Sequence, residues 1–297
     1  MKTQSRRDFI KISAAGTLGA LLLPSCKSNP ASFVALQLYT VRDFMNTQED
    51  VKASLKKIAD IGYKKLELAG YADGKFYKFE PKEFRKIVDD LGLEVLSSHT
   101  NVEGAANLEN SKKVAEDHAA LGMKYAIQPW VNPPDRNLEY YTKMVQQMNE
   151  AGKAFKSVGI KFGYHNHNFE FANLDGKIPY FDIILPGTDK NYVTMELDLF
   201  WTTKAGQDPV EIFKKYPGRF ELLHCKDMYT KQEPFFDTVG VEDFAPVGDG
   251  VLDFNRIFAE AKTGGVKYYV VEQDLSKGSP FDAIKTSFDN LTQKLLA

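Results

Sequence analysis

Amphipathic and apolar segments alternate along the chain. Stretches with apolar residues at helical spacing end in a glycine, and a short apolar, β-rich run follows each time. The order glycine, apolar residue, charged residue begins at Gly62, Gly92, Gly122, Gly159 and Gly265. Glycine is favoured directly after the last turn of a helix. Each copy therefore predicts a helix that is followed by a strand, and the repetition predicts a fold in which helices and strands alternate regularly.

Eight short apolar runs are the predicted strands, at 33–38, 64–68, 94–98, 125–128, 161–165, 194–198, 220–224 and 268–272. Helices are predicted at 49–61, 81–91, 110–121, 138–158, 209–215, 252–262 and 280–296. Several strands are apolar on both faces, which is typical of parallel strands covered by helices. The pattern predicts an α/β fold, a single (β/α)₈ TIM barrel over residues 31–297.

Two predicted connections are long and follow strands at the C-terminal face of this barrel, at 168–190 and 228–249. Long loops on that face usually shape a substrate pocket. His118, by contrast, falls in the middle of the predicted helix 110–121, and we expect it on the exposed helix surface.

Polar side chains stand where the predicted strands end, which is where TIM barrels carry their active sites. Four neighbouring strands end at His165, Asp198, His224 and Glu272. Each would direct one nitrogen or oxygen ligand toward a common point, which predicts one divalent metal ion. Two imidazoles with two carboxylates suit Mn²⁺, Zn²⁺, Co²⁺ or Fe²⁺ better than Mg²⁺ or Ca²⁺, which prefer oxygen ligands.

Further strand-end and loop residues are candidates for substrate binding: Glu67, His99, Gln128, Trp201 and Tyr39. Each has a structural alternative, because a polar strand-end residue can cap a loop and an aromatic residue can serve packing alone. Glu196 points the same way as Asp198 but lies deeper in its strand, so we expect it to support the ligands from behind.

The segments 197–200 (LDLF) and 247–254 (VGDGVLDF), together with His224 and Glu272, resemble the xylose isomerase-like barrel superfamily in its sugar phosphate isomerase/epimerase branch. The resemblance covers about residues 33–296. It implies one divalent metal at the strand ends that binds neighbouring oxygens of a sugar. It also implies that Asp198, His224 and Glu272 are ligands.

The chain departs from this family at the fifth strand, where the family's ketose 3-epimerases place a glutamate. Here the strand ends in His165 and continues to His167, and alternation puts both on one side. We expect His165 as ligand and His167 as an acid/base or substrate group; the reverse order stays open. Glu272 is then the one remaining carboxylate base, which suits a one-sided isomerisation or a β-elimination. Lys226, His167 and Glu170 are the candidate acids.

The composition narrows the range of possible functions. Hydrophobic residues make up 43% and charged residues 26% of the 297 positions, and the formal net charge is -2. This balance gives no support to nucleic-acid binding, and a nuclease analogous to metal-dependent repair barrels is disfavoured for the same reason. The two cysteines, Cys26 and Cys225, cannot form a disulfide framework.

Residues 1–30 are expected to be a signal segment and tether rather than part of the barrel. The sequence SRRDFIK at 5–11 resembles a twin-arginine export motif, and LPSC at 23–26 resembles a bacterial lipobox. We therefore expect an exported, periplasmic or membrane-anchored protein with a lipid anchor at Cys26; plain cleavage near residue 30 is the alternative.

The leading functional hypothesis is a metal-dependent isomerase or epimerase that abstracts a proton α to the carbonyl of a sugar or keto-sugar. The second is a metal-dependent lyase or dehydratase on a 3-keto-glycoside or an inosose-like compound, which the strand-end histidines and the expected export favour. The third is a non-catalytic sugar-binding lipoprotein, since a fold does not fix an activity. Barrels of this kind often form homodimers, and a homodimer stays open here.

Overall fold

The computed structural model describes residues 29–101, 108–231, 234 and 239–297. The expected export motif and Cys26 lie outside the described residues. Among the residues that are described, no helix is both long enough and apolar enough to cross a membrane.

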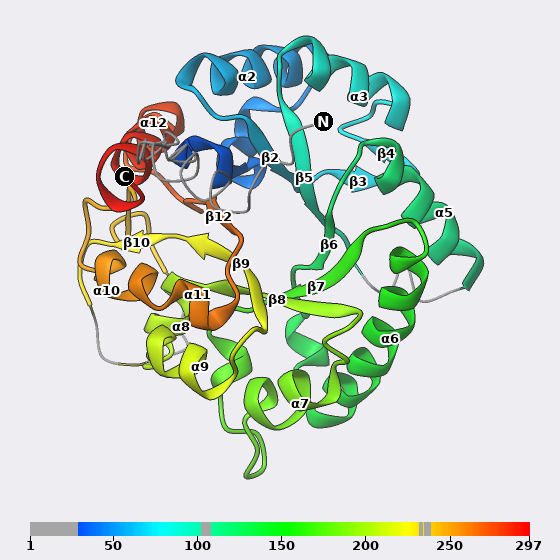
Figure 1. Ribbon diagram of the computed structural model, residues 1–297, viewed down its shortest axis with the longest axis vertical. Helices are drawn as coiled ribbons and strands as arrows, with labels where there is room; N and C mark the ends of the chain where they lie inside the picture. The colour runs from blue at the N-terminus through cyan, green and yellow to red at the C-terminus, as the bar shows by residue number, and fades with distance from the viewer. Residues whose placement is uncertain (1–28, 102–107, 232–233, 235–238) are drawn as a thin grey trace, which may run out of the picture.

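Eight parallel strands close into one barrel in the order β1-β12-β9-β8-β7-β6-β5-β2 (Figure 1). The strands are β1 (Val34–Gln37), β2 (Lys65–Leu68), β5 (Glu94–His99), β6 (Tyr125–Gln128), β7 (Lys161–His165), β8 (Val193–Asp198), β9 (Phe220–Cys225) and β12 (Tyr268–Val271). The predicted (β/α)₈ fold is confirmed, and the predicted bounds of β6 and β7 match the observed ones.

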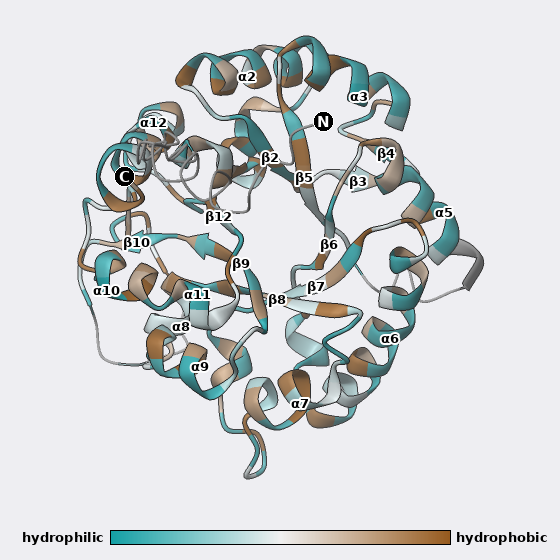
Figure 2. Cartoon of the chain, in the orientation of Figure 1, coloured by the Kyte–Doolittle hydropathy of each residue, from teal (hydrophilic) through white to brown (hydrophobic). Residues whose placement is uncertain are grey.

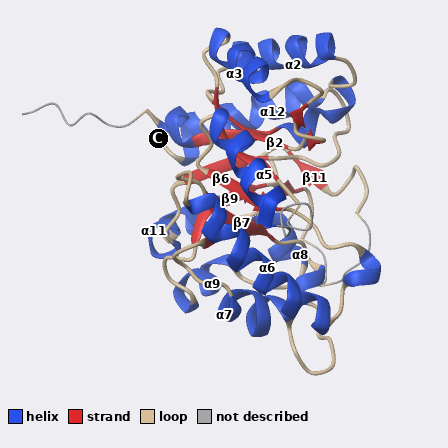
Figure 3. Cartoon of the chain, turned by 90° about the vertical axis from the view of Figure 1, so that its right-hand side faces the viewer, coloured by secondary structure: helices blue, strands red, loops and turns tan. Residues whose placement is uncertain are grey.

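The helices form a ring around the strands (Figure 1), and the side view shows them outside the strands (Figure 3). They are α2 (Gln48–Ile61), α3 (Pro81–Asp90), α5 (Leu108–Ala120), α6 (Leu138–Lys156), α7 (Leu185–Gly187), α8 (Leu199–Lys204), α9 (Pro209–Lys215), α10 (Phe254–Ala259), α11 (Ala261–Gly264) and α12 (Pro280–Asn290). Hydrophilic and hydrophobic segments alternate along this ring (Figure 2), as amphipathic helices require when one face packs on a sheet.

The glycines that mark the sequence repeat have the backbone geometry that the pattern predicts. The φ angles of Gly62, Gly92, Gly122, Gly159 and Gly265 are 123°, 65°, 73°, 84° and 90°. Side chains other than glycine adopt positive φ only at a cost. These positions therefore end the helices and turn the chain back into the barrel.

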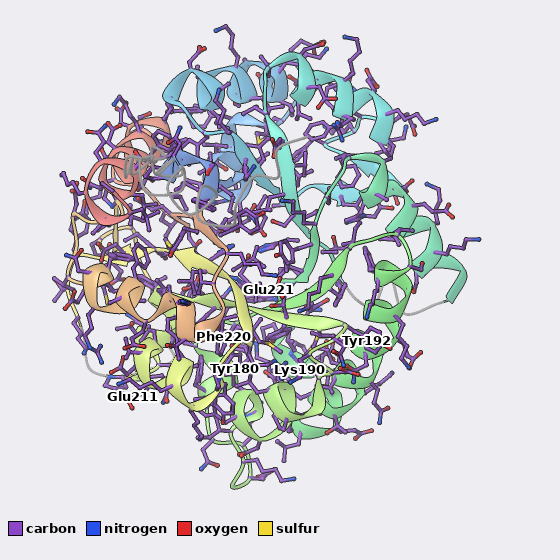
Figure 4. The ribbon with its side chains drawn as sticks, viewed as in Figure 1. Tyr180, Lys190, Tyr192, Glu211, Phe220 and Glu221 are labelled. Atoms are coloured by element: carbon purple, nitrogen blue, oxygen red, sulfur yellow. The ribbon has the colours of Figure 1, made fainter. Side chains whose placement is uncertain are left out.

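The N-terminal end of the barrel is closed by polar contacts to Glu221, which lies near the barrel axis in Figure 4. Its carboxylate accepts hydrogen bonds from Lys161 Nζ at 2.7 Å, Lys267 Nζ at 2.8 Å and Tyr125 Oη at 2.8 Å. These groups come from the beginnings of β9, β7 and β6 and from the residue before β12. Contacts at the N-terminal face of a TIM barrel serve stability, and active sites lie at the C-terminal face, so the chemistry is expected at the opposite end.

The long connection after β9 is fastened to the barrel by Asp227. Its buried carboxylate accepts backbone N–H groups of Met228, Gly248, Gly250 and Leu252 at 2.8–3.1 Å. A Cβ on Gly250 would lie 2.3 Å from the Met228 carbonyl oxygen, so only glycine allows this approach. The connection also forms the small hairpin β10 (Asp227–Met228) with β11 (Phe244–Ala245).

The sequence expectation for His118 was wrong. The side chain is fully buried, with Nε2 2.7 Å from Thr100 Oγ1 and Nδ1 2.7 Å from the Val114 carbonyl oxygen. The inner face of α5 packs its ring edge-on against Tyr71 and Phe76, which belong to the β3 (Tyr71–Ala72) and β4 (Lys75–Phe76) hairpin. Burial lowers the pKa of His118 to about 4.

This burial predicts a pH-dependent stability. Between about pH 6.5 and pH 4 the unfolded chain protonates this imidazole and the folded chain does not, so the contribution is complete above pH 6.5 and is lost as the pH falls. The loss amounts to about 3 kcal/mol near pH 4. In urea unfolding, His118→Gln should therefore destabilise the protein near neutral pH and much less near pH 4. If the free energies of unfolding of the variant and the wild type changed in parallel with pH, His118 would not be the source of this pH dependence.

Candidate metal centre and substrate pocket

Four side chains from the C-terminal ends of neighbouring strands meet at one point: His165 on β7, Asp198 on β8, His224 on β9 and Glu272 directly after β12. All four are buried, and their ligand atoms lie within 4.8 Å of one another. His165 Nε2 and His224 Nδ1 are 3.8 and 3.9 Å from Asp198 Oδ2. His224 Nδ1 is 3.0 Å from Glu272 Oε2. Donors that share one ion at about 2.0–2.2 Å lie roughly 3–3.5 Å apart. The observed separations of 3.0, 3.8 and 3.9 Å are equal to or slightly longer than this spacing, so a small contraction of the set would bring it to the dimensions of a single-metal site.

Two deeper carboxylates orient the two imidazoles. Glu196 Oε2 is 3.2 Å from His165 Nδ1 and 3.0 Å from His224 Nε2, and Glu67 Oε1 is 2.6 Å from His224 Nε2. These contacts leave His165 Nε2 and His224 Nδ1 pointing toward Asp198 and Glu272. A carboxylate behind a histidine fixes its ring and tautomer in many metal sites. Glu196 thus lies behind the ligand set, where the sequence placed it.

The ligand set fits a divalent cation. Asp198 Oδ1 accepts the Trp201 N–H at 2.8 Å and caps α8, whereas Asp198 Oδ2 is buried and accepts no hydrogen bond. Asp198 Oδ2 has an ion-pair contact with Lys226 Nζ at 3.2 Å, and a cation among the four side chains would give this buried oxygen a second partner. His165 belongs to the set of converging ligand atoms and His167 does not, which favours His165 as the ligand from β7.

A second set of four residues shares His165 and His224 with the first: His99, His165, Glu196 and His224. In this set the His224 Nε2 atom would have to give up its 2.6 Å contact with Glu67. The set also lacks the two strand-end carboxylates, and Glu196 would have to leave its place behind both imidazoles. The set of His165, Asp198, His224 and Glu272 therefore fits a metal better.

Lys226 lies beside the ligand set. Its Nζ is 2.6 Å from Glu272 Oε2, 2.9 Å from Asp274 Oδ1 and 3.2 Å from Asp198 Oδ2. Burial opposes the charge, but Asp198, Asp274 and Glu272 outweigh it and hold the pKa of Lys226 well above its usual value. This ammonium group is therefore a cation that faces the carboxylates of the site.

The charges of the ligand residues follow from these contacts. Burial would raise the pKa of Glu272, but Lys226 and His224 hold it well below its usual value. Burial raises the pKa of Asp198 to about 6. Burial would lower the pKa of His224, but Glu196 and Glu67 hold it well above its usual value. Opposite charges thus compensate one another within a few ångströms.

The ligand set opens into a pocket of about 710 Å³, whose lining includes His99, His165, Trp201, Lys226 and Glu272. His167 lies on the wall, with its ring stacked on Phe169 at 5.3 Å and edge-on to Trp130 at 4.8 Å. Its Nδ1 is buried without a hydrogen-bond partner. Burial and then the charge of Lys226 hold the pKa of His167 well below its usual value, so the ring is neutral near pH 7.

The predicted substrate-binding residues divide into two groups. Tyr39, His99 and Trp201 line the pocket, as a substrate contact requires. Glu67 and Gln128 do not line it. Glu67 lies beneath the floor, where it accepts hydrogen bonds from Gln37 Nε2 at 2.8 Å and Ser97 Oγ at 2.6 Å. Gln128 Nε2 donates to the Trp130 carbonyl oxygen at 2.6 Å. For these two the expectation of direct substrate contact is corrected to a supporting role.

The prediction of Glu170 as a candidate acid is also corrected. Its fully buried carboxyl group lies outside the pocket lining, and it accepts hydrogen bonds from Tyr164 Oη at 2.6 Å and the His167 backbone N–H at 2.8 Å. Burial raises the pKa of Glu170 to about 7. Tyr164 faces outward because strand residues alternate, so Glu170 acts on the pocket only through the position of His167.

Several pocket residues were not predicted as site residues: Arg42, Arg136, Asn168 and Asp274. They lie in connections after the strands, where no periodicity fixes the direction of a side chain. Asp274 offers a partial signal, because it lies two residues after the predicted ligand Glu272.

Comparison with known proteins identifies the family. A sequence model of the family described as Xylose isomerase-like TIM barrel matches residues 55–294. An inosose dehydratase of Geobacillus kaustophilus is 26% identical over 286 residues, which cover 84% of this chain and 89% of that protein. An inosose dehydratase of Mesomycoplasma hyopneumoniae is 26% identical over 288 residues, with coverages of 87% and 94%.

Solved structures agree with this family. A sugar phosphate isomerase/epimerase from Parabacteroides distasonis is 31% identical and superposes with a TM-score of 0.75, covering 89% of this chain and 98% of that chain. The closed barrel, the strand-end residues and the match over residues 55–294 lead to one conclusion. The chain belongs to the xylose isomerase-like TIM barrel family.

Proposed function

We propose that this protein is a divalent-metal-dependent lyase that eliminates water or an alcohol from a cyclic keto-sugar or keto-cyclitol. The observation that carries the proposal is a carboxylate and an ammonium group paired on one side of the pocket. Glu272 and Lys226 are 2.6 Å apart, directly after the adjacent strands β12 and β9. Across the pocket the end of β7 carries the His167 imidazole in place of a carboxylate. Epimerisation would need that imidazole as the acid/base group on the second face, whereas the pair Glu272 and Lys226 by itself supplies the base and the acid of an elimination.

The proposed step balances within the site. The Glu272 carboxylate takes the proton α to the carbonyl, and the C–H electron pair forms the enolate double bond. The enolate then re-forms the carbonyl while the bond from the β-carbon to its oxygen breaks. The departing oxygen takes a proton from Lys226, so that the products are an unsaturated ketone and water or an alcohol. The His167 imidazole, neutral and facing the pocket, is the second candidate base.

In this proposal His165, Asp198, His224 and Glu272 hold the metal ion. A divalent ion bound there would polarise the carbonyl group and stabilise the negative charge that develops on its oxygen. The mixed imidazole and carboxylate ligands favour Mn²⁺, Zn²⁺, Co²⁺ or Fe²⁺.

The relatives support the same function. Two curated proteins that align with most of this chain are inosose dehydratases, and the loss of water from an inosose is an elimination next to a ketone. The second candidate function is sugar isomerisation or epimerisation, which the similarity to the Parabacteroides distasonis structure favours. Both reactions begin with the same proton transfer and differ in the fate of the enolate.

The test is to incubate the Mn²⁺-loaded or Zn²⁺-loaded protein with inosose and with 3-keto-glycosides in D₂O and to monitor the products by NMR. The proposal predicts an unsaturated ketone together with released water or alcohol. Deuterium at the α-carbon of an intact skeleton would favour the isomerase or epimerase instead. Binding without exchange or elimination would favour a sugar-binding protein.

A further inference from the structure

The charged side chains of the pocket do not balance one another. Its lining contains two carboxylates, Glu272 and Asp274, and both contact Lys226, at 2.6 and 2.9 Å. It also contains two arginines, Arg42 and Arg136. Neither guanidinium forms an ion pair with any carboxylate among the side chains described, at 29–101, 111–231, 234 and 239–297. Within that part of the chain, the two arginines present positive charge to the pocket that no ion pair compensates.

Two aromatic rings and one backbone carbonyl group hold Arg136 in place. Its Cζ lies 3.5 Å from the centre of the Phe169 ring and 4.7 Å from that of Trp130. Its Nε donates to the Val131 carbonyl oxygen at 3.1 Å, and its Nη2 is buried without a partner. Stacking holds the guanidinium plane in one orientation, and its unpartnered Nη2 is a donor that an anionic group entering this side of the pocket would satisfy.

Arg136 also stands close to the proposed reaction centre. Phe169 and Trp130, on which it stacks, both contact the His167 ring. Behind this wall, the positive charge of Arg136 acts to lower the pKa of Glu170. The Glu170 oxygens accept hydrogen bonds from Tyr164 Oη and the His167 backbone N–H instead of from Arg136. Arg42, by contrast, stacks on Tyr39, which is 44% exposed at the mouth of the pocket, and donates to the Tyr39 carbonyl oxygen.

We propose that Arg136 forms an anion-binding subsite and that the physiological substrate carries an anionic group, a carboxylate or a phosphate, on the side of the pocket formed by Trp130, His167 and Phe169. The inference rests on the proposed function only in placing the substrate in this pocket. It makes Arg136 a residue that determines substrate specificity. The subsite requires an anionic group on the substrate, which neither elimination nor isomerisation requires by itself.

The test compares ligands that differ in one group. 4-Nitrophenyl β-D-glucuronide and 4-nitrophenyl β-D-glucoside differ at one carbon, by a carboxylate against a hydroxymethyl group. Glucose 6-phosphate and glucose form the corresponding phosphate pair. Dissociation constants are measured by NMR titration on the full-length, Mn²⁺-loaded protein. We expect the glucuronide, the phosphate or both to bind roughly tenfold to hundredfold tighter than its neutral counterpart.

In Arg136→Gln this preference should disappear while the binding of the neutral ligands is unchanged. Arg136→Lys should keep part of it, because the charge remains and the planar fork is lost. Arg42→Gln is the matched control, since it removes one pocket arginine at the mouth and should leave the preference intact. Preference in the carboxylate pair alone, or in the phosphate pair alone, identifies the anionic group.

Equal binding within both ligand pairs would overturn the proposal, as would a preference that survives in Arg136→Gln or that is lost equally in Arg42→Gln. Because binding alone is measured, these results are independent of turnover. A protein that eliminates water from neutral inosose but shows no anion preference refutes the subsite and leaves the lyase standing. A protein that prefers the anionic ligands through Arg136 but eliminates nothing from a keto-sugar refutes the lyase and supports the subsite.

Discussion

Replacing Glu272 by glutamine is expected to lower the rate of α-proton exchange by about 10²–10⁴-fold, the usual contribution of a positioned acid/base group. The amide has nearly the same shape but cannot accept the proton. It also removes the charge that pairs with Lys226 at 2.6 Å. The rate is measured as deuterium uptake or elimination in D₂O at saturating metal, so that weaker metal binding does not limit it.

The control for this variant is Glu221→Gln, at the opposite end of the barrel. Glu221 accepts hydrogen bonds from two lysines and a tyrosine, so the variant should melt at a lower temperature and keep its turnover. If Glu272→Gln keeps wild-type exchange, Glu272 is not the base. A loss in His167→Gln together with normal exchange in Glu272→Gln would move that role to His167.

Replacing His224 by glutamine is expected to weaken metal binding by at least about 100-fold, because even residues behind the ligands typically contribute 10–100-fold. The variant should also be less stable, since Glu67 and Glu196 lose a buried cationic partner at 2.6 and 3.0 Å. Breaking a buried ion pair on one side costs about 3–5 kcal/mol. Zn²⁺ titration calorimetry and elemental analysis measure the first effect, and urea unfolding measures the second.

His118→Gln is the matched control, because it also removes a fully buried imidazole, but one outside both ligand sets. It should lose stability near neutral pH and still bind one metal ion per chain. Undiminished Zn²⁺ affinity in His224→Gln would exclude the ligand set, and equal losses of affinity in both variants would show that the effect is only one of stability.

The fold could be predicted because its signals are local. The glycines with positive φ after five of the helices and the apolar runs of strand length are both readable from a few neighbouring residues. The juxtaposition of His165, Asp198, His224 and Glu272 was predictable for a related reason. Parallel strands in a closed barrel bring residues at their C-terminal ends to one place, and the family resemblance indicated which of them to choose.

The errors lie where the outcome depends on packing between distant segments. His118 is buried because the β3–β4 hairpin covers the inner face of α5, and no helical period reveals that. Glu67 ends a strand as predicted, but its side chain is occupied by Gln37, Ser97 and His224. Arg136 reaches the pocket from a connection, where stacking on Phe169 rather than sequence spacing sets its direction.

The central claim is that one divalent ion is bound by His165, Asp198, His224 and Glu272. Anomalous diffraction from crystals of the Zn²⁺-loaded protein, recorded on both sides of the zinc absorption edge, tests it most directly. The account predicts one strong peak per chain within about 2.0–2.2 Å of His165 Nε2, His224 Nδ1 and an oxygen of each carboxylate. A peak among His99, Glu196 and His224, or none within the barrel, would contradict it.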